Sequence, residues 1–138
     1  FGRRSDRSEM DAGCWELVPS GGVEDTAVGP TGQVSLERCI LIELEEEIGI
    51  GASELSARSR AVALVEDPRS HVTDVGIMLA TTSPAAQIQR RFAVLENREY
   101  SQLEIVAPAE VRAFRGSLAD SLGAVSVALL DALMHAGL

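Results

Sequence analysis

Four glutamates stand within five positions of one short segment, ELEEEIGI, residues 43–50. At about 100° per residue of a helix, Glu43, Glu46 and Glu47 fall on one face, whereas Glu45 points elsewhere. Carboxylate oxygens are hard ligands that suit Mg²⁺ or Mn²⁺, and Mg²⁺ takes few of them while it keeps waters and substrate phosphates. The segment therefore predicts either a divalent-cation site or a solvated acidic face on a surface helix.

A glycine turn upstream favours the cation site. CWELV, residues 14–18, alternates apolar and polar residues as a half-buried strand does, and PSGG, residues 19–22, then breaks the chain. The two glycines permit backbone conformations and close approaches that other residues cannot adopt. A backbone turn that faces a helix end rich in carboxylates can form a metal–phosphate site, so we expect these two segments to meet.

The element that must position the carboxylates is a helix over about residues 35–48. Its apolar residues recur at helical spacing and would anchor it in the core: Leu41, Leu44 and Ile48. Ser35 is the expected N-cap, and Gly49 supplies the stop.

The remaining segments complete an α/β (α+β) chain. They predict a β-hairpin over 60–67 and 71–82, a short helix or an excursion over 83–98, a strand over 102–107, a short helix opened by Pro108, and an amphipathic C-terminal helix that ends at Gly137. Strands interleaved with three helices predict a mixed sheet covered by helices on both faces.

Length and composition limit the classes of function. The chain has 138 residues, which predicts one domain over 1–138, and none of its apolar runs approaches the roughly 18 residues that span a bilayer. We therefore expect a soluble protein without a membrane partner. The formal net charge of −9 would repel a polyphosphate backbone, which argues against a nucleic-acid polymer as partner. A small phosphate ester stays compatible with this charge when a divalent metal stands between the two anions.

The cysteines and the first residue bear on the compartment and on the extent of the chain. Cys14 and Cys39 show neither metal-ligand spacing nor a disulfide framework, so we expect buried free thiols in a reducing cytoplasm. The chain starts at Phe1 and FGRRS resembles the exit of a strand, so we expect a piece of a longer protein with a truncated N-terminus.

PSGGVE followed by ELEEEIGI resembles the signature of the Nudix hydrolases. That signature is Gly, five residues, Glu, seven residues, then Arg-Glu-U-x-Glu-Glu-x-Gly-U, with U an aliphatic residue. The matching positions are Gly21, Glu43, Leu44, Glu46, Glu47, Gly49 and Ile50. Residues 13–50 carry this specific evidence, and the likeness in architecture extends over most of the chain. The resemblance implies an α/β/α sandwich, a mixed sheet flanked by helices.

Three departures from the signature stand out. Ile42 occupies the position of the family's Arg, and the mid-signature Glu falls on Val34. From Gly21 to Glu43 there are 22 positions rather than the signature's 15, an excess of seven that we place at 25–31. Ile42 cannot donate the charge-assisted hydrogen bond by which an arginine would orient a glutamate, and its apolar side chain suggests a cover, such as the inserted loop.

The resemblance implies a metal-dependent pyrophosphatase that cleaves a nucleoside diphosphate linked to another moiety, or a related small diphosphate. Bound Mg²⁺ or Mn²⁺ would neutralise phosphate oxygens and lower the pKa of a bound water, and a carboxylate would take its proton. Glu46 and Glu47 would be the main metal ligands, Glu43 a further ligand or the base, and the Gly21 carbonyl a backbone ligand.

Further residues complete the expected site. Family members often recruit a glutamate from a loop before a late strand, which points to Glu99 as a catalytic residue, with Glu96 as second choice. Arg4 is the arginine expected to bind the phosphates, because it leads to the same sheet end as the glycine turn, where Gly22 is a second candidate for substrate binding. Trp15 fits core packing better than stacking on a nucleobase.

Two other functions stay open. A catalytically impaired ligand-binding or regulatory module on the same fold is favoured by Ile42 and Val34. An isoprenoid-diphosphate isomerase would want a catalytic Cys and Glu pair, which is not recognisable around Cys14. The non-phosphate half of the substrate and a homodimer, frequent among family members, are equally open.

Overall fold

The computed structural model describes residues 1–8, 10–68, 70–96 and 99–135. Over these residues the chain is a mixed α+β protein with two small antiparallel sheets and four α-helices. The first sheet has the order β2–β1–β5, formed by β1 (Gly2–Arg4), β2 (Trp15–Glu16) and β5 (Tyr100–Leu103). The second sheet is the hairpin of β3 (Arg60–Glu66) and β4 (Thr73–Met78).

The pairing of these strands differs from the single mixed sheet that the sequence suggests. The strands of each sheet pair antiparallel, and the described residues place them in two separate sheets. The short link between β3 and β4 accounts for the antiparallel hairpin, because a parallel pair needs a crossover of a dozen or more residues. The predicted hairpin is thus present, with both strands beginning or ending within a few residues of the expected limits.

The acidic segment lies on the predicted helix. α1 (Leu36–Glu43) begins after Ser35, whose Oγ accepts a hydrogen bond from the Arg38 backbone N–H at 3.2 Å. It continues into η2 (Leu44–Ile48), a π-helical turn that the sequence pattern does not predict. The helix ends at Gly49, which has φ of +78°. Both predicted ends are therefore confirmed, and a wider turn replaces the last part of the regular helix.

The segments between and after the sheets form helices and short turns. These are η1 (Asp25–Ala27), η3 (Ala52–Glu54), α2 (Ala85–Val94), η4 (Pro108–Glu110), α3 (Val111–Ser117) and α4 (Ala124–His135). The ambiguous stretch 83–98 thus contains a helix, and Pro108 opens a helical turn as predicted. The predicted helix end at Gly137 lies outside the described residues.

β5 is shorter and earlier than the strand predicted over 102–107. Its partner β1 is only three residues long, and Phe1, just before it, accepts the Glu104 backbone N–H at 2.8 Å. The residues after Glu104 have no partner strand in the described chain. They therefore form no sheet hydrogen bonds, although the prediction extends the strand to residue 107.

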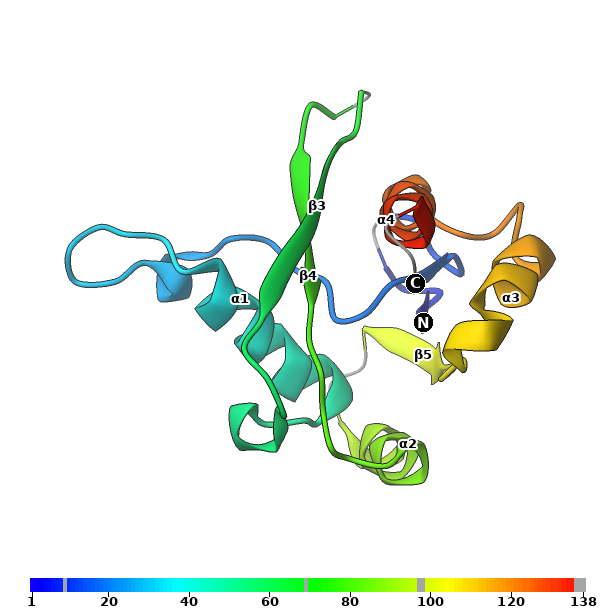
Figure 1. Ribbon diagram of the computed structural model, residues 1–138, viewed down its shortest axis with the longest axis horizontal. Coiled ribbons are helices and arrows are strands. Elements are labelled where there is room, and N and C mark those ends of the chain that lie inside the picture. Colours follow the sequence, from blue (N-terminus) through cyan, green and yellow to red (C-terminus); the bar gives the residue numbers. More distant parts are fainter. Residues whose placement is uncertain (9, 69, 97–98, 136–138) are drawn as a thin grey trace.

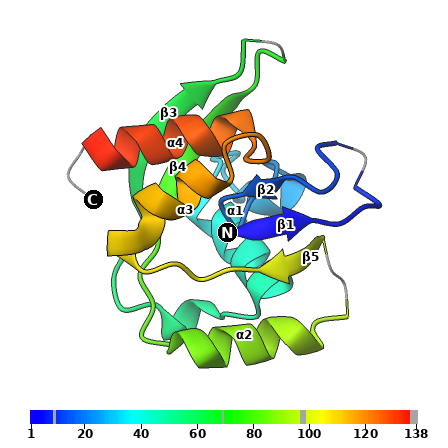
Figure 2. The same ribbon diagram turned by 90° about the vertical axis from the view of Figure 1, so that its right-hand side faces the viewer.

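The core lies under the acidic helix and connects it to both sheets. Its buried centre is Leu44, Ile48 and Ile50, and partly buried residues pack around it: Val18, Leu41, Leu55, Leu79, Ile88 and Leu103. Figure 1 shows α3 and α4 on one side of the β3–β4 hairpin and most of α1 on the other. α4 packs on β3 and also reaches the first sheet, where Ser126 Oγ accepts the Leu17 N–H at 2.9 Å (Figure 2).

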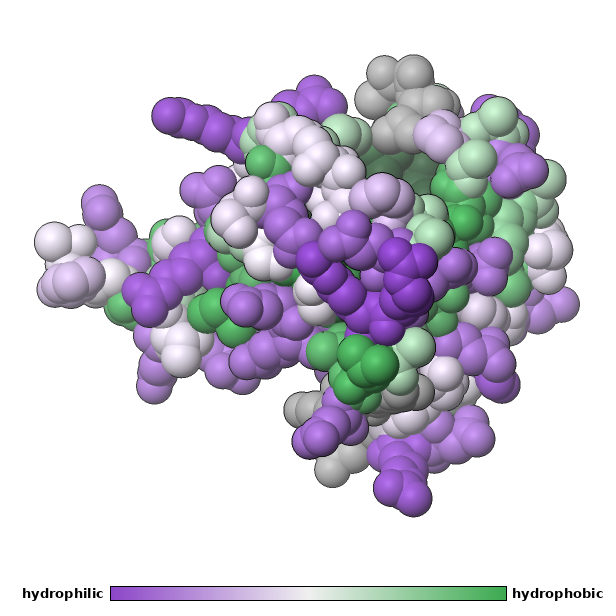
Figure 3. Space-filling model, turned by 90° about the horizontal axis from the view of Figure 1, so that it is seen from below, coloured by the Kyte–Doolittle hydropathy of each residue, from purple (hydrophilic) through white to green (hydrophobic). Residues whose placement is uncertain are grey.

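The face seen from below, where α2 lies, is mostly hydrophilic, with smaller hydrophobic patches between (Figure 3). Within the described ranges, none of the helices is both long and apolar enough to cross a membrane.

Candidate functional site

The glycine turn lies against the acidic helix, as expected from the sequence. The Ser20 backbone N–H donates a hydrogen bond to Glu47 Oε2 at 3.0 Å. A Cβ atom on Gly21 would overlap the carboxylate of Glu43, so only glycine allows this approach. One residue further, the Gly22 carbonyl accepts a hydrogen bond from the Cys39 thiol at 3.1 Å. The turn therefore follows α1 and η2 along the face that carries two of the predicted glutamates.

Glu47 is the most unusual carboxylate of this face. Its residue is only 7% exposed, and its Oε1 is fully buried without a hydrogen-bond partner. Burial is the main cause that raises the pKa of Glu47 to about 8; the charges of Glu99 and Glu43 and a side-chain hydrogen bond with Glu99 add to it, and the Ser20 N–H opposes it. A buried carboxylate in this state needs a proton or a cation nearby.

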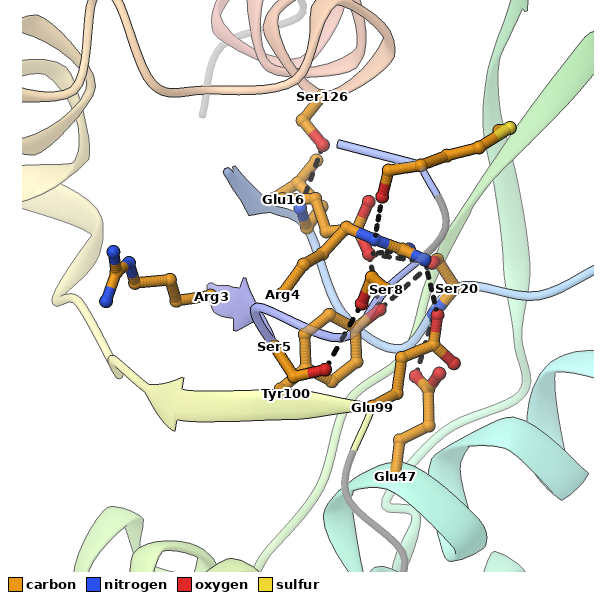
Figure 4. Close-up of polar contacts among 12 residues, drawn as sticks. Arg3, Arg4, Ser5, Ser8, Glu16, Ser20, Glu47, Glu99, Tyr100 and Ser126 are labelled. Carbon is orange, nitrogen blue, oxygen red and sulfur yellow. Dashed lines mark hydrogen bonds and ion pairs between the residues drawn. The ribbon is translucent and has the colours of Figure 1, made fainter. Parts of the chain in front are cut away.

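Glu99 faces Glu47 across the site (Figure 4). Two ionised carboxylates cannot hydrogen-bond with each other, so this pair is satisfied only when a proton or a cation lies between them. The loop before β5 thus brings to Glu47 the glutamate that the resemblance suggested, whereas Glu96 is an exposed residue just after α2.

Arg4 binds carboxylates at each end of its guanidinium group. Its Nη2 pairs with Glu99 Oε1 at 2.9 Å, its Nη1 with Glu16 Oε1 at 2.8 Å, and its Nε donates to the Met10 carbonyl at 3.0 Å. All three nitrogens thus have acceptors within the protein, and the expected role of Arg4 as a phosphate ligand stays a prediction.

A buried phenol fixes the other end of this network. Tyr100 is 1% exposed, and its hydroxyl donates to Glu16 Oε1 at 2.6 Å and lies 3.1 Å from Ser20 Oγ. Burial and the nearby carboxylates raise the pKa of Tyr100, so it keeps its proton. Sequence reasoning missed Glu16, Ser20 and Tyr100 as parts of the site. Glu16 fits the alternation of its half-buried strand, so no signal in the sequence points to it.

The other helix glutamates differ in their surroundings. Glu43 is half-buried at the end of α1, and burial, followed by the charges of Glu46, Glu24 and Glu99, raises its pKa. Glu46 is exposed and acts on Glu43 through its charge. Glu45 borders a different hollow, described next, which confirms that it points away from the other three.

The three departures from the signature lie outside this cluster. Val34 is 53% exposed and forms a bridge with Val28, a residue of the insert, in a loop that projects from the molecule beside α1 (Figure 1). Ile42 borders an open hollow of about 270 Å³ together with Ser35, Glu37, Arg38, Leu41, Glu45 and Ala52. Residues 25–31 do not line this hollow, but η1 of the insert packs against α1, so the cover of Ile42 by the insert stays a prediction.

Trp15 and the cysteines take structural places. Trp15 is half-buried and meets Phe114 edge to face, with ring centroids 6.0 Å apart, which favours packing over stacking on a base. Cys14 and Cys39 are free and partly buried.

The donor set of the cluster fits a hard divalent cation. Among the residues that the structure describes, no three His, Cys, Asp or Glu side chains already stand in an arrangement that could hold a metal ion. Mg²⁺ needs only one or two carboxylates, because waters and substrate phosphates supply the rest. Glu47 and Glu99 offer two facing carboxylates, one with a buried oxygen lacking a partner, so the residues present fit such an ion.

Comparisons with protein-family models, with curated proteins and with solved structures found no match to this chain.

Proposed function

We propose that the chain is a divergent Nudix hydrolase, with the family's α/β/α sandwich, that acts in the cytoplasm as a metal-dependent pyrophosphohydrolase. Its substrate is a nucleoside diphosphate linked to another moiety, or a related small diphosphate. One observation carries the proposal: Glu47 has a buried oxygen without a partner, faces Glu99, and is held by the turn whose Gly21 touches Glu43.

The roles of the residues follow from their surroundings. Bound Mg²⁺ or Mn²⁺ would neutralise the charge of the diphosphate oxygens and lower the pKa of a bound water. Glu47 and Glu99 would hold the ion, with the Gly21 carbonyl and the exposed Glu46 as further oxygen donors. Glu43 would take the proton of the attacking water, since its raised pKa brings it closer to neutral pH, where a general base works best.

Turnover of a panel of diphosphates in Mg²⁺ or Mn²⁺ tests this function, with Glu47→Gln as the decisive variant. Its amide keeps the shape of the side chain and removes the charge, so we expect at least a roughly hundredfold loss of kcat. Glu45→Gln removes the same charge from the opposite side of the helix and should keep kcat within about twofold. Full activity of Glu47→Gln would overturn the site assignment.

A binding or regulatory module is the second candidate, and a specific observation favours it. Ile42 and Val34 both lie outside the carboxylate cluster, so neither contributes an orienting or metal-binding group there. Under this alternative, calorimetry would show metal-dependent binding of a diphosphate while no product forms. Turnover of any member of the panel would count against it.

A further inference from the structure

We propose that Arg4 is a positioning residue that holds Glu99 opposite Glu47, and that it does not bind substrate. The part of this inference that concerns metal binding rests on the proposed function. The contacts of Arg4 with Glu16 and Glu99 do not depend on that function. Arg4 comes from β1 and Glu99 from the loop before β5, and these two strands pair directly.

The contacts around Arg4 form a closed ring. The Ser20 backbone N–H holds Glu47, and the Ser20 hydroxyl lies 3.3 Å from Glu16 Oε1. Glu16 pairs with Arg4, and Arg4 pairs with Glu99, which faces Glu47 again (Figure 4). Each member except Arg4 is an acid or a hydroxyl residue, so Arg4 supplies the positive charge that keeps three carboxylates in one ring.

The anchored side of Arg4 explains how it fixes Glu99. Glu16 is anchored, because the buried Tyr100 hydroxyl donates to the same oxygen that Arg4 contacts. The Arg4 side chain is 18% exposed, while that of Glu99 is 42% exposed. The guanidinium therefore connects a largely buried, anchored carboxylate to a more exposed one. A planar, rigid fork can make both contacts at once, which the single ammonium of lysine cannot do in the same geometry.

Mn²⁺ binding measured by calorimetry on the metal-free protein tests this role. Second-layer partners of metal ligands typically change metal affinity by about 10- to 100-fold, so Arg4→Gln should weaken Mn²⁺ binding by that factor. Arg4→Lys should lie between Arg4→Gln and the wild type, which keeps the test open when Arg4→Gln folds poorly.

Arg3→Gln is the matched control. Arg3 is the neighbouring residue on the same strand, donates to the Gly13 carbonyl at 3.2 Å, and points away from the cluster (Figure 4). It should bind Mn²⁺ as the wild type does. Wild-type affinity in both Arg4 variants, or equal losses in the Arg3 and Arg4 variants, would overturn the positioning role.

A second measurement needs no metal. In excess chelator, we expect Glu99→Gln to lower Tm in the wild type more than in the Arg4→Gln background. The reason is that the substitution breaks an ion pair only in the wild type. Additive changes would overturn the proposal. A third outcome separates the two proposals: the Tm changes are non-additive, but the wild-type protein binds no Mn²⁺. This outcome would overturn the proposed function and support Arg4 as the residue that sets the position of Glu99.

Discussion

At the scale of single residues, the site is defined by a carboxylate that the fold places out of water. Burying an ionised group without a partner is costly, so a protein usually pairs it or lets it keep a proton. Glu47 has one backbone donor on Oε2, no partner on Oε1 and a second carboxylate in front of it. This arrangement is unfavourable unless a proton or a cation compensates the two carboxylates.

Gly21→Ala is predicted to damage the site while it leaves the fold intact. The new Cβ would occupy the place of the Glu43 carboxylate, but that carboxylate is the far end of a flexible side chain and can move away. We expect Tm within about 2 °C of the wild type, as for surface changes, together with at least a tenfold loss of Mn²⁺-dependent turnover.

Gly22→Ala provides the comparison for stability, since a Cβ there meets no atom within 4 Å. Its Tm should equal that of the wild type. Undiminished turnover of Gly21→Ala would show that Glu43 need not stand beside the turn.

Part of this residue-scale picture is predictable from the sequence. The spacing of Glu43 and Glu47 places both on one face of a helix, because helical periodicity relates these positions locally. That the glycine turn meets this face was expected from the chemistry of a metal–phosphate site and from the resemblance, and not from any local period. The ring through Arg4, Glu16 and Tyr100 is not predictable in this way. Its members come from three strands that are distant in sequence, and local periodicity does not show which strands pair. The partners of Arg4 are therefore known only from the fold.

At the scale of elements, the acidic helix depends on how it ends. Gly49 has φ of +78°, in the left-handed region, and a Cβ there would lie 3.2 Å from Arg91 Cβ. Gly49→Ala should therefore lower the free energy of unfolding by about 1–2 kcal/mol. Gly51→Ala is the control: its φ is −83° and the nearest atom to its Cβ is 3.9 Å away.

Urea unfolding of both variants measures the difference. An alanine at 51 is expected to be neutral or stabilising by up to about 1 kcal/mol, because it reduces the entropy of the unfolded chain. Equal stabilities of the two variants would mean that the helix end does not require glycine.

A polar clip joins the end of this helix to α2. Arg91 Nη1 donates to Glu54 Oε2 at 2.6 Å and to the Gly49 carbonyl at 3.2 Å, and Ser83 Oγ donates to Glu54 at 2.8 Å. Arg91 above all, then Ser83 and the Gly51 N–H, lower the pKa of Glu54 from its ordinary value near 4.5 to about 2. The clip keeps Gly49, two residues after Glu47, in a defined place.

The lowered pKa of Glu54 predicts an acid-dependent loss of stability. A depressed folded pKa means that the ionised group stabilises the fold above pH 4.5, and that this contribution is lost as the pH falls toward about 2. Glu54→Gln should be less stable than the wild type at pH 7, with the difference vanishing near pH 2. Urea unfolding across this range measures it.

Glu45→Gln, an exposed glutamate of η2, serves as the control for the change in charge. Its stability should follow the pH dependence of the wild type. A constant difference between Glu54→Gln and the wild type from pH 7 to pH 2 would contradict the role of the clip.

The elements themselves were predictable to different degrees. The limits of the acidic helix follow from Ser35 and Gly49, since caps are local features. The extent of β5 depends on the length of β1, and the division into two sheets depends on which edges pair. Both are decided by partners distant in sequence, so the alternation of apolar residues alone predicted a strand over residues for which the described part of the chain offers no partner strand.

At the scale of the whole molecule, α4 holds the two sheets together. It packs on β3, and a Cβ on Gly76 of β4 would come within 2.7 Å of Leu129 Cδ2. On its other side, Ser126 accepts the Leu17 N–H next to the glycine turn. Loss of α4 packing should therefore affect both sheets, and through Leu17 the approach to the site.

Leu130→Ala tests this coupling. Leu130 is 5% exposed, so its truncation should lower the free energy of unfolding by about 2–5 kcal/mol. Leu64→Ala, at a position 73% exposed, should change it by less than about 0.5 kcal/mol. Calorimetric unfolding measures both, and a small effect of Leu130→Ala would show that the sheets are stable without a firmly packed α4.

The inserted loop also has a consequence for how such a protein can change. A bridge between Val28 and Val34, together with the Ser35 N–H that donates to the Ala27 carbonyl, closes residues 29–33 into a loop, so both ends of this stretch are held before the helix begins. What lies between them can vary in length and composition while the glutamates keep their positions. Insertions and deletions there are therefore expected to be tolerated in evolution, and an engineer can graft another segment at this position without moving the acidic helix.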